Sequence, residues 1–454
     1  MTSTFAPPAS TILTAADPGW DEARQAWNLA VDQQPAAIAC PASAPDVMAA
    51  VNYARRHGLR VAAQGTGHNA APLGPLSDSV LIKTDGMRRV TIDPRRMTAR
   101  AEAGAVWQDV TDATADHGLA ALAGSSPNVG VTGYTTGGGL SWLGRAYGLS
   151  ANNVEAFEVV TADGRLVRAD AAQETDLFWA LRGGGGSFGV VTAAELRLFP
   201  VTEVCAGLLW WPVEAAAEVL QAWRELTQRG LPDEFSTAAR LMRFPALPQI
   251  PEPVRGGSFV VIDAFHLGSE AEAADILAPL RALRPVTDTV HLMPARDLGQ
   301  VHLDPPQPTP GVGDGVLLDI LPAVAIDGLV QLAGPGADTP LLVVELRQLG
   351  GEMRWARPGN GALAMIDAGY ALFAGGLVTS PESATAITRD IRAIQAAMAP
   401  WAARQMYLNF AETRRDPATF WTPQAYTRLR QIKAAVDPED RIRSNHPIPP
   451  AAAH

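Results

Sequence analysis

Three glycine-rich stretches within residues 64–192 constrain the fold of this chain more than any other feature. They read QGTGHN (64–69), AGSSPNVGVTGYTTGGGLSWLG (123–144) and LRGGGGSFGVVT (181–192). Glycine lets the backbone approach an anion closely and turn several N–H groups toward it, which holds phosphates without cationic side chains. The stretches therefore suit the pyrophosphate of a dinucleotide, while the alternative for any single stretch is a set of ordinary tight turns.

The two commonest nucleotide-binding fingerprints are missing from the chain. It contains no GxxxxGK(S/T) motif, and no GxGxxG opens a helix inside a strand-helix-strand unit. The sequence therefore excludes a P-loop and a Rossmann dinucleotide fold.

Length and charge narrow the class of protein further. The chain has 454 residues, of which 47% are apolar, and this is enough for two hydrophobic cores. A net charge of -11 argues against nucleic acid or an anionic membrane as the main partner. Cys40 and Cys205 are the only cysteines, so a disulfide framework or a structural metal site is not expected. No leader pattern or membrane-length apolar run occurs, so we expect a cytoplasmic protein; its oligomeric state is left open.

Capping and turn residues delimit the elements of the first half. Ser43 and Asp46 have capping-box spacing and Gly58 ends the apolar periodicity, which predicts a helix over 43–58. A strand over 59–64 follows, so QGTGHN lies in the turn after it. The other elements expected here are a helix over 106–118 and two hairpins, which turn at Asp93-Pro94 and Asp163-Gly164.

The pattern changes after Pro200, where glycine loops become rare and longer strands alternate with amphipathic helices. This texture predicts an antiparallel sheet with helices on one face. DPPQPTPGVGDG (304–315) is expected to form a loop over or beside a site, because proline and glycine oppose both helix and strand. The expected strands lie at 258–268, 315–322, 341–351 and 370–378, and the expected helices near 212–229, 269–283 and 381–399.

One histidine, His68, directly follows the Gly-Thr-Gly turn of the first stretch. It is a hydrogen-bonding loop residue, a metal ligand, or a group that reacts with a bound cofactor. A metal role lacks partner ligands nearby in the sequence. A neutral imidazole beside a phosphate-binding turn can act as a nucleophile toward a cofactor, so this hypothesis stands beside the ordinary loop residue.

Five segments, taken in order, match one known family. They are VAAQGTGHN, GSSPNVGVTGYTTGGGLSWLGRAYGLSANNV, DLFWALRGGGGSFGVVT, YLNF and YTRLRQIKAAVDPEDRIRSNHPIPP. The first resembles a loop that carries a flavin-linked histidine, the next two resemble further flavin-binding stretches, and the last two resemble a segment that returns to the flavin. Together they resemble the berberine bridge enzyme-like branch of the vanillyl-alcohol oxidase flavoproteins over nearly the whole chain.

The resemblance implies an α+β protein with a PCMH-type FAD-binding domain of two subdomains and a substrate domain whose antiparallel sheet is covered by helices. The implied parts are an N-terminal tail (1–19), an FAD-binding domain (20–200), a substrate-binding domain (201–400) and a C-terminal segment (401–454) that completes the FAD-binding domain. His68 is implied to be joined covalently to the 8α-methyl carbon of FAD. The implied FAD-binding residues are Gln64, Gly65, Thr66, Gly67, His68, Asn69, Ser125, Ser126, Val129, Gly130, Gly133, Tyr134, Gly137, Gly138, Gly189, Val190, Asn409 and Asn445.

The chain departs from the family pattern at several of these positions. Many relatives carry a second flavin link from a cysteine before a proline, but Ser126 stands here before Pro127, so a single covalent bond is expected. Thr66 and Gln64 replace a glycine and an arginine that are common in relatives. Val129 stands where a small residue leaves oxygen a path to the flavin, which favours an oxidase over a dehydrogenase.

The family reaction is hydride transfer from a small-molecule substrate to the flavin, followed by reduction of O2 to hydrogen peroxide. An alcohol needs a base for its hydroxyl proton, whereas a neutral amine does not. Carbohydrate-oxidising relatives often carry a tyrosine after the Asn of a Y-x-N segment, but Phe410 follows Tyr407 and Asn409 here. Tyr407 is therefore either a residue of the site or a buried structural donor.

Glu345 and Arg347 lie in the strand VVELRQLGG, on one face, with Gln348 on the other. The resemblance favours Glu345 as base or substrate anchor; the alternative is an ordinary ion pair with Arg347 on a solvated face. Arg347 is further expected to bind an acidic group or to stabilise negative charge on the flavin. Four aromatic residues, taken as core or as lining of an apolar pocket, are Trp210, Trp211, Phe244 and Phe265.

Two rival functions stay open at this point. One is a dehydrogenase of the same fold that passes electrons to another acceptor. The other is a non-catalytic module that keeps flavin as a scaffold and binds an apolar ligand.

Overall fold

The computed structural model of the protein describes residues 12–248 and 250–452, and these residues form three β-sheets. The first, the N-terminal sheet, has the order β1-β2-β4-β3-β18, in which the last four strands run parallel. Helix α2 (Ala44–Arg56) packs against it and begins where the Ser43 hydroxyl accepts the Asp46 N–H, as its capping pattern predicts. The strands are β1 (Ile12–Leu13), β2 (Ala37–Ala39), β3 (Arg60–Gln64), β4 (Ser79–Lys83) and β18 (Ile442–Arg443).

The second or middle sheet is antiparallel, with the order β5-β6-β9-β7-β8. Both hairpins expected from the sequence are confirmed, because β5 pairs with β6 and β7 pairs with β8. The strands are β5 (Val90–Asp93), β6 (Thr98–Glu102), β7 (Val154–Val160), β8 (Leu166–Asp170) and β9 (Val190–Arg197). The helices of this half are α1 (Trp20–Ala23), α3 (Trp107–Ala115), α4 (Val131–Thr136), α5 (Gly144–Tyr147), α6 (Thr175–Leu181) and α11 (Pro423–Val436).

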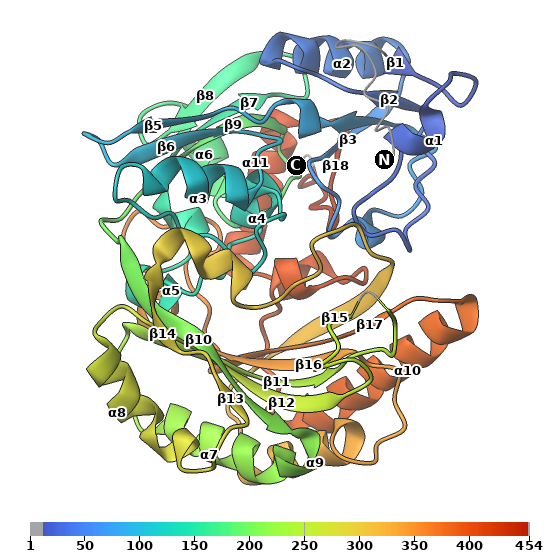
Figure 1. Ribbon diagram of the computed structural model, residues 1–454. Helices are drawn as coiled ribbons and strands as arrows, with labels where there is room; N and C mark the ends of the chain where they lie inside the picture. Colours follow the sequence, from blue (N-terminus) through green and yellow to red (C-terminus); the bar gives the residue numbers. More distant parts are fainter. Residues whose placement is uncertain (1–11, 249, 453–454) are drawn as a thin grey trace.

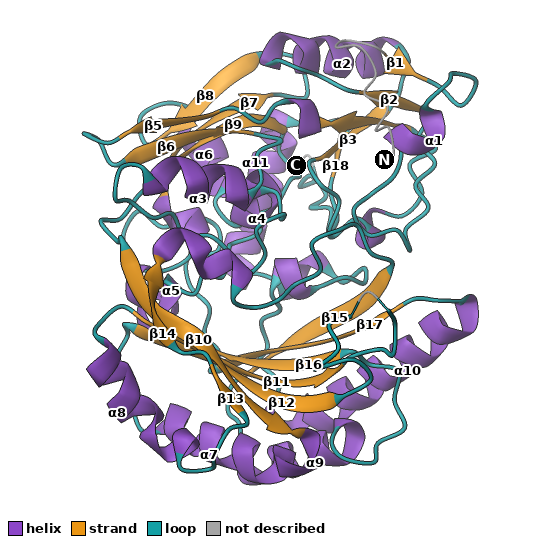
Figure 2. Cartoon of the chain, viewed as in Figure 1, coloured by secondary structure: helices purple, strands orange, loops and turns teal. Residues whose placement is uncertain are grey.

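The third or large sheet is wholly antiparallel, with the order β13-β10-β12-β11-β16-β17-β15 and with β14 beside β10. Four helices cover its outer face, and its inner face is turned toward the other half of the molecule (Figure 2). Its strands are β10 (Glu203–Pro212), β11 (Phe235–Arg243), β12 (Ser258–His266), β13 (Thr287–Asp288), β14 (His291–Pro294), β15 (Gly311–Leu318), β16 (Val343–Gln348) and β17 (Tyr370–Leu377). The helices are α7 (Ala216–Gln228), α8 (Glu270–Arg281), α9 (Ala323–Ala333) and α10 (Pro381–Met398). The two halves lie one above the other in Figure 1, and the expected α+β fold is confirmed.

Strand alternation divides the large sheet into two chemically different faces. Gln348 points to the helix layer, where its amide donates to the carbonyl of Thr227 in α7. Glu345 and Arg347 point to the inner face, as predicted. Both are buried, at 4% and 7% exposed, so the alternative of a solvated ion pair is wrong. Alternation along a strand shows which side chains lie on the same face of the sheet, but it does not show whether other parts of the protein cover that face.

The four aromatic residues of the pocket hypothesis do not share one environment. Trp210, Phe244 and Phe265 pack in the apolar cluster of the inner face. Trp211 belongs to the core between the sheet and its helices, and its indole N–H donates to the carbonyl of Leu283. Trp211 therefore cannot line a pocket on the inner face.

Strand β15 corrects the expected loop at 304–315. It begins at Gly311 and ends at Leu318, four residues earlier at each end than the strand predicted at 315–322. A side chain at Gly313 or Gly315 would collide with Phe373 or Phe410, so these glycines let aromatic rings cover the strand. Backbone pairing with β17 outweighs the low strand propensity of glycine here. Strands β10 and β11 and helix α9 were not among the predicted elements.

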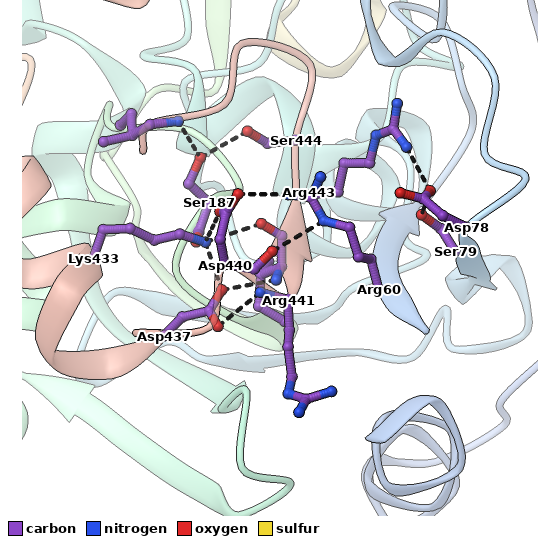
Figure 3. A network of polar contacts seen from close by, with 12 residues as sticks. Arg60, Asp78, Ser79, Ser187, Lys433, Asp437, Asp440, Arg441, Arg443 and Ser444 are labelled. Atoms are coloured by element: carbon purple, nitrogen blue, oxygen red, sulfur yellow. Dashed lines mark hydrogen bonds and ion pairs between the residues drawn. The ribbon is translucent and has the colours of Figure 1, made fainter. Parts of the chain in front are cut away.

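The chain ends return to the first half. Residues 12 and 13 of the expected tail form β1 on β2, while residues 1–11 lie outside the described residues. Near the other end, the buried ammonium of Lys433 in α11 donates to the carbonyls of Ser187 and Ile442 and contacts Asp437 at 2.5 Å (Figure 3). These contacts fasten β18 beside β3.

The domain boundaries at 200 and 400 stay a prediction. Over the described residues, no helix is both long and apolar enough to cross a bilayer.

Candidate active site

His68 lies in the turn that follows β3. Its ring stacks on Trp27, with centroids 4.1 Å apart and planes 16° from parallel. The Nδ1 atom lies 2.7 Å from Thr66 Oγ1, and the Nε2 atom lies 3.2 Å from Asn128 Oδ1. Burial lowers the pKa of His68 to about 4, against weaker opposing effects of Asn128 and Asp304. The imidazole is therefore neutral at pH 7 and keeps one nucleophilic nitrogen.

The turn before His68 is tightly folded around the side chain of Gln64. Gly67 has a φ of 84°, and a Cβ there would lie 2.8 Å from Gln64 Nε2. Gln64 is buried, and both polar atoms of its amide lack a hydrogen-bond partner among the described residues. Gly65 precedes this bend, with the Ala103 carbonyl 3.5 Å from where its Cβ would be. The turn thus presents an amide that only a polar ligand or water can satisfy.

Asn69 links the same turn to the C-terminal segment. Its amide donates to the carbonyls of Leu408 and Ala411 at 3.4 and 3.2 Å, and its own carbonyl accepts from the side chain of Asn445. The Oδ1 atom of Asn69 is buried without a partner. Two of the predicted FAD-binding residues, which are nearly four hundred positions apart in the sequence, therefore meet at this turn.

The second glycine-rich stretch approaches His68 through Asn128. Ser126 is buried and its hydroxyl donates to Asn128 Oδ1 at 2.8 Å, while the neighbouring Ser125 is partly buried. Val129 is partly buried against the core of this half, and its carbonyl accepts from the backbone N–H of Trp107. The stretch then enters α4, with Gly130 at the helix start and Gly133 inside it.

Tyr407 and Asn409 dock on the end of this stretch. The Asn409 amide donates to the Tyr134 carbonyl at 2.9 Å and to the Tyr407 hydroxyl at 3.0 Å, and that hydroxyl also accepts the N–H of Gly139. A side chain at Gly137 would collide with Asn409, and one at the adjacent Gly138 with a leucine and with Tyr407. Burial raises the pKa of Tyr407 above its usual range. The Tyr407 hydroxyl thus accepts two hydrogen bonds and keeps its proton at neutral pH.

The third stretch contributes backbone rather than side chains. A Cβ at Gly189 would lie 2.6 Å from Val159 and 3.0 Å from the Val160 carbonyl, so only glycine lets the chain pass so close to β7. Val190 is fully buried in the core under the N-terminal sheet.

The unpartnered polar atoms test whether FAD fits these stretches. Among the described residues, several buried side chains of the first two stretches have polar atoms without a hydrogen-bond partner, namely Gln64, Asn69, Thr132 and Tyr134; other such atoms lie elsewhere in the fold. Buried polar groups in proteins are nearly always paired, so this set points to a ligand rich in donors and acceptors. FAD has such groups along its whole length, in the ring, the ribityl chain and the pyrophosphate. The donor set therefore fits FAD.

Glu345 and Arg347 form a buried ion pair on the inner face of the large sheet. Glu345 Oε1 accepts from Arg347 Nη2 and Nε at 2.7 and 2.8 Å, and the guanidinium lies 4.2 Å from the ring centre of Trp142. Glu345 Oε2 lies 3.5 Å from His302 Nε2. Burial by itself raises the pKa of Glu345, but Arg347 and His302 outweigh it and hold the pKa well below its usual range.

Sequence reasoning missed His302 and its partners. His302 Nδ1 lies 2.9 Å from Asp304 Oδ1, and the His302 carbonyl accepts from Arg240, which in turn forms a two-pronged ion pair with Asp263. Burial and Arg240 lower the pKa of His302, but Asp304 and Glu345 outweigh them and raise it to about 9. The signal in the sequence was weak, because His302 and Glu345 lie 43 positions apart on elements without a shared motif.

One short segment connects this charged cluster to the His68 turn. Residues 302–305 carry His302 against Glu345, and the carbonyl of Pro305 accepts from the amide of Asn128, which contacts His68. This geometry is consistent with the expectation that the proline-rich segment forms a loop beside a site, but only for residues 304–310, because β15 begins at Gly311. A pocket lined in part by Pro127 and Trp142 adjoins the same region.

A second titratable group missed in the sequence is Glu412. Its carboxylate lies against Gly313 and Phe373 on the inner side of the sheet, and Phe373 pairs across strands with Glu345. Burial and the neighbouring Asp314 raise the pKa of Glu412 to about 7.

Known proteins share both the sequence and the architecture of this chain. The family of the FAD binding domain matches residues 35–170. (R)-6-Hydroxynicotine oxidase of Paenarthrobacter nicotinovorans is 27% identical over 475 aligned residues, which cover 99% of each chain. The crystal structure of 6-hydroxy-D-nicotine oxidase from Arthrobacter nicotinovorans has a TM-score of 0.82 at 25% identity, covering 97% of this chain and 98% of that one.

A more distant relative shares the fold alone. The BBE-like 1 protein of Physcomitrella patens has a TM-score of 0.82 at 19% identity, covering 98% of this chain and 97% of that one. The full-length match to a named oxidase and the unpartnered polar atoms that fit FAD both indicate a flavin-dependent enzyme. The chain is an FAD-linked oxidoreductase that contains an FAD binding domain and has the fold of the BBE-like proteins.

Proposed function

We propose that the protein is an oxidase whose FAD is linked covalently to His68 and which takes a hydride from a C–N or C–O bond of a small organic substrate. FAD, when bound, accepts the two electrons and passes them to O2, which becomes hydrogen peroxide. The observation that carries this proposal is that segment 302–305 contacts both the Glu345 cluster and Asn128, whose side chain in turn contacts His68. This chain of contacts supports the proposal that His68 holds the flavin near a substrate site at Glu345.

The state of His68 supports the proposed link. A pKa lowered to about 4 leaves the ring neutral, and a neutral imidazole is the form that adds to an electrophilic carbon. The stacking contact with Trp27 restricts rotation of the ring. Ser126 stands where relatives carry a second link, so one attachment is proposed.

The substrate side favours an amine over an alcohol. Glu345 is held ionised by Arg347 and His302, and a carboxylate with a strongly lowered pKa is a weak base. The Tyr407 hydroxyl already accepts two hydrogen bonds and has a raised pKa. Because a neutral amine loses hydride without a base, we propose that Glu345 and Arg347 orient the substrate by hydrogen bonds instead.

The first experiment denatures the purified protein and the His68→Ala variant in acid and records intact mass and released flavin. The wild type is expected to keep one FAD by mass, and the variant to release it. Release of all FAD from the wild type would refute the covalent link.

The second experiment separates the rival functions with a screen of amines, alcohols and sugars. Peroxide released in proportion to substrate supports the oxidase. Flavin that is bleached anaerobically but reoxidised only by an added acceptor supports the dehydrogenase. Tight ligand binding without any bleaching supports the non-catalytic module.

A further inference from the structure

Asn128 lies between the His68 turn and the substrate half of the molecule. Both polar atoms of its side-chain amide are hydrogen-bonded. Its Oδ1 atom lies 3.2 Å from His68 Nε2 and accepts the Ser126 hydroxyl at 2.8 Å. Its Nδ2 atom donates to the carbonyl of Pro305 at 3.0 Å. No other described side chain contacts His68 Nε2 by a hydrogen bond.

These partners fix which way the amide points. If oxygen and nitrogen were exchanged, the Asn128 oxygen would face the Pro305 carbonyl at 3.0 Å, and two acceptors cannot share that contact. The oxygen therefore faces His68. Because an amide oxygen only accepts, the His68 proton resides on Nε2 and the lone pair on Nδ1, where the Thr66 hydroxyl donates at 2.7 Å.

We propose that Asn128 is a positioning residue for attachment of FAD to His68, and that the carbonyl of Pro305 holds it in that position. The inference rests on the proposed covalent link. Attachment replaces one hydrogen of the FAD methyl group and the imidazole N–H by a C–N bond. The two protons and two electrons that leave reduce O2 to hydrogen peroxide, so atoms and electrons balance.

The amide oxygen acts at the moment when charge appears on the ring. As Nδ1 forms its bond, the imidazole becomes cationic until Nε2 loses its proton. A hydrogen bond to a charged donor is about twice as strong as one to a neutral donor, so Asn128 stabilises the ring more as the bond forms. Asp304, which raises the pKa of His68 against the effect of burial, acts in the same direction.

The partner of Asn128 is itself held by the first half of the chain. The amide of Asn28 donates to the Gly311 carbonyl and its oxygen accepts the Gly311 N–H, while the Thr309 N–H donates to the Trp27 carbonyl. Segment 302–311 is thus hydrogen-bonded to the first half at two places, at Pro305 through Asn128 and at Thr309 and Gly311 through Trp27 and Asn28. Attachment of FAD accordingly requires the substrate half to be docked on the FAD-binding half.

The test follows attachment by intact mass in proteins purified under air and incubated with added FAD. It compares the wild type with Asn128→Ala, which removes the acceptor, and Asn128→Asp, which keeps an acceptor oxygen for Nε2 but loses the donor to the Pro305 carbonyl. Asn360→Ala is the matched control, because it removes side-chain hydrogen bonds to two backbone carbonyls in a distant loop. Samples are quenched in acid over time, and both protein mass and released FAD are recorded.

We expect Asn128→Ala to attach FAD roughly tenfold more slowly than the wild type while still releasing bound FAD in acid. Asn128→Asp should attach FAD faster than Asn128→Ala but more slowly than the wild type, because it keeps the acceptor and loses the donor to Pro305. Asn360→Ala should stay within a few-fold of the wild type. Attachment by Asn128→Ala at the wild-type rate would overturn the proposal, and so would the absence of any bound FAD in both Asn128 variants, since that result assigns Asn128 to binding. A wild type that releases all its FAD overturns the covalent link itself, which is a different outcome.

Discussion

Replacing His302 by asparagine removes one protonated side chain from the buried cluster that contains Glu345 and Asp304. The pKa of His302 rises from 6.5 to about 9 in the folded protein, which corresponds to about 3 kcal/mol of stability. A raised pKa means that the folded state holds the proton more tightly than the unfolded state. The contribution is therefore complete below pH 6.5 and is lost as the pH rises through 9. His302 is only 6% exposed, so solvent screening reduces this figure little.

The assay measures the free energy of urea unfolding from pH 6 to pH 10 for the wild type and His302→Asn. The difference between the two proteins should be about 3 kcal/mol larger at pH 6 than near pH 10, because their other titrations cancel. The pKa values of Asp304 and Glu345 are lowered, so both stay ionised throughout this range. Unfolding curves that differ by a constant amount at every pH would refute the reasoning, as would a His302 NMR titration centred near 6.5.

Three further substitutions test single contacts. Tyr407→Phe should lower peroxide formation by less than about tenfold, because the hydroxyl serves as an acceptor for Gly139; a loss beyond a hundredfold would identify it as a base. Lys433→Met should lower the free energy of unfolding by about 3–5 kcal/mol, since it leaves the buried Asp437 without its cation, and an unchanged urea midpoint would contradict this. Arg145→Leu should cost at least about 2 kcal/mol by the same measurement, because Arg145 donates from α5 to four carbonyls of the substrate half; a stable, fully active variant would argue against that role.

Local signals in the sequence predicted local structure well. The spacing of Ser43 and Asp46 identified the start of α2, and Asp163-Gly164 identified the β7–β8 hairpin. Both depend on residues within a few positions of each other, where capping and turn geometry decide the backbone. The order of the glycine-rich stretches, read through a family resemblance, then gave the FAD-binding half.

Prediction failed where distant segments decide the outcome. The start of β15 at Gly311 depends on pairing with β17, some sixty positions away, and no local preference of Gly311–Gly315 indicates a strand. His302 became a candidate only when the fold brought it against Glu345. The burial of Glu345 and Arg347 likewise depends on the other half covering the inner face, which alternation along β16 cannot reveal.

The segment from 302 to 311 explains why the site needs both halves of the molecule. It belongs to the connection between β14 and β15 of the large sheet, yet its hydrogen bonds run to Asn28 and Asn128 in the first half. Its histidine meanwhile contacts Glu345 on the inner face. A displacement that breaks one of these contacts moves the backbone that makes the others, because fewer than ten residues separate them. The environment of His68 and the ionisation of Glu345 are therefore linked through a single stretch of chain, although His68 follows a strand of the N-terminal sheet and Glu345 lies in the large sheet.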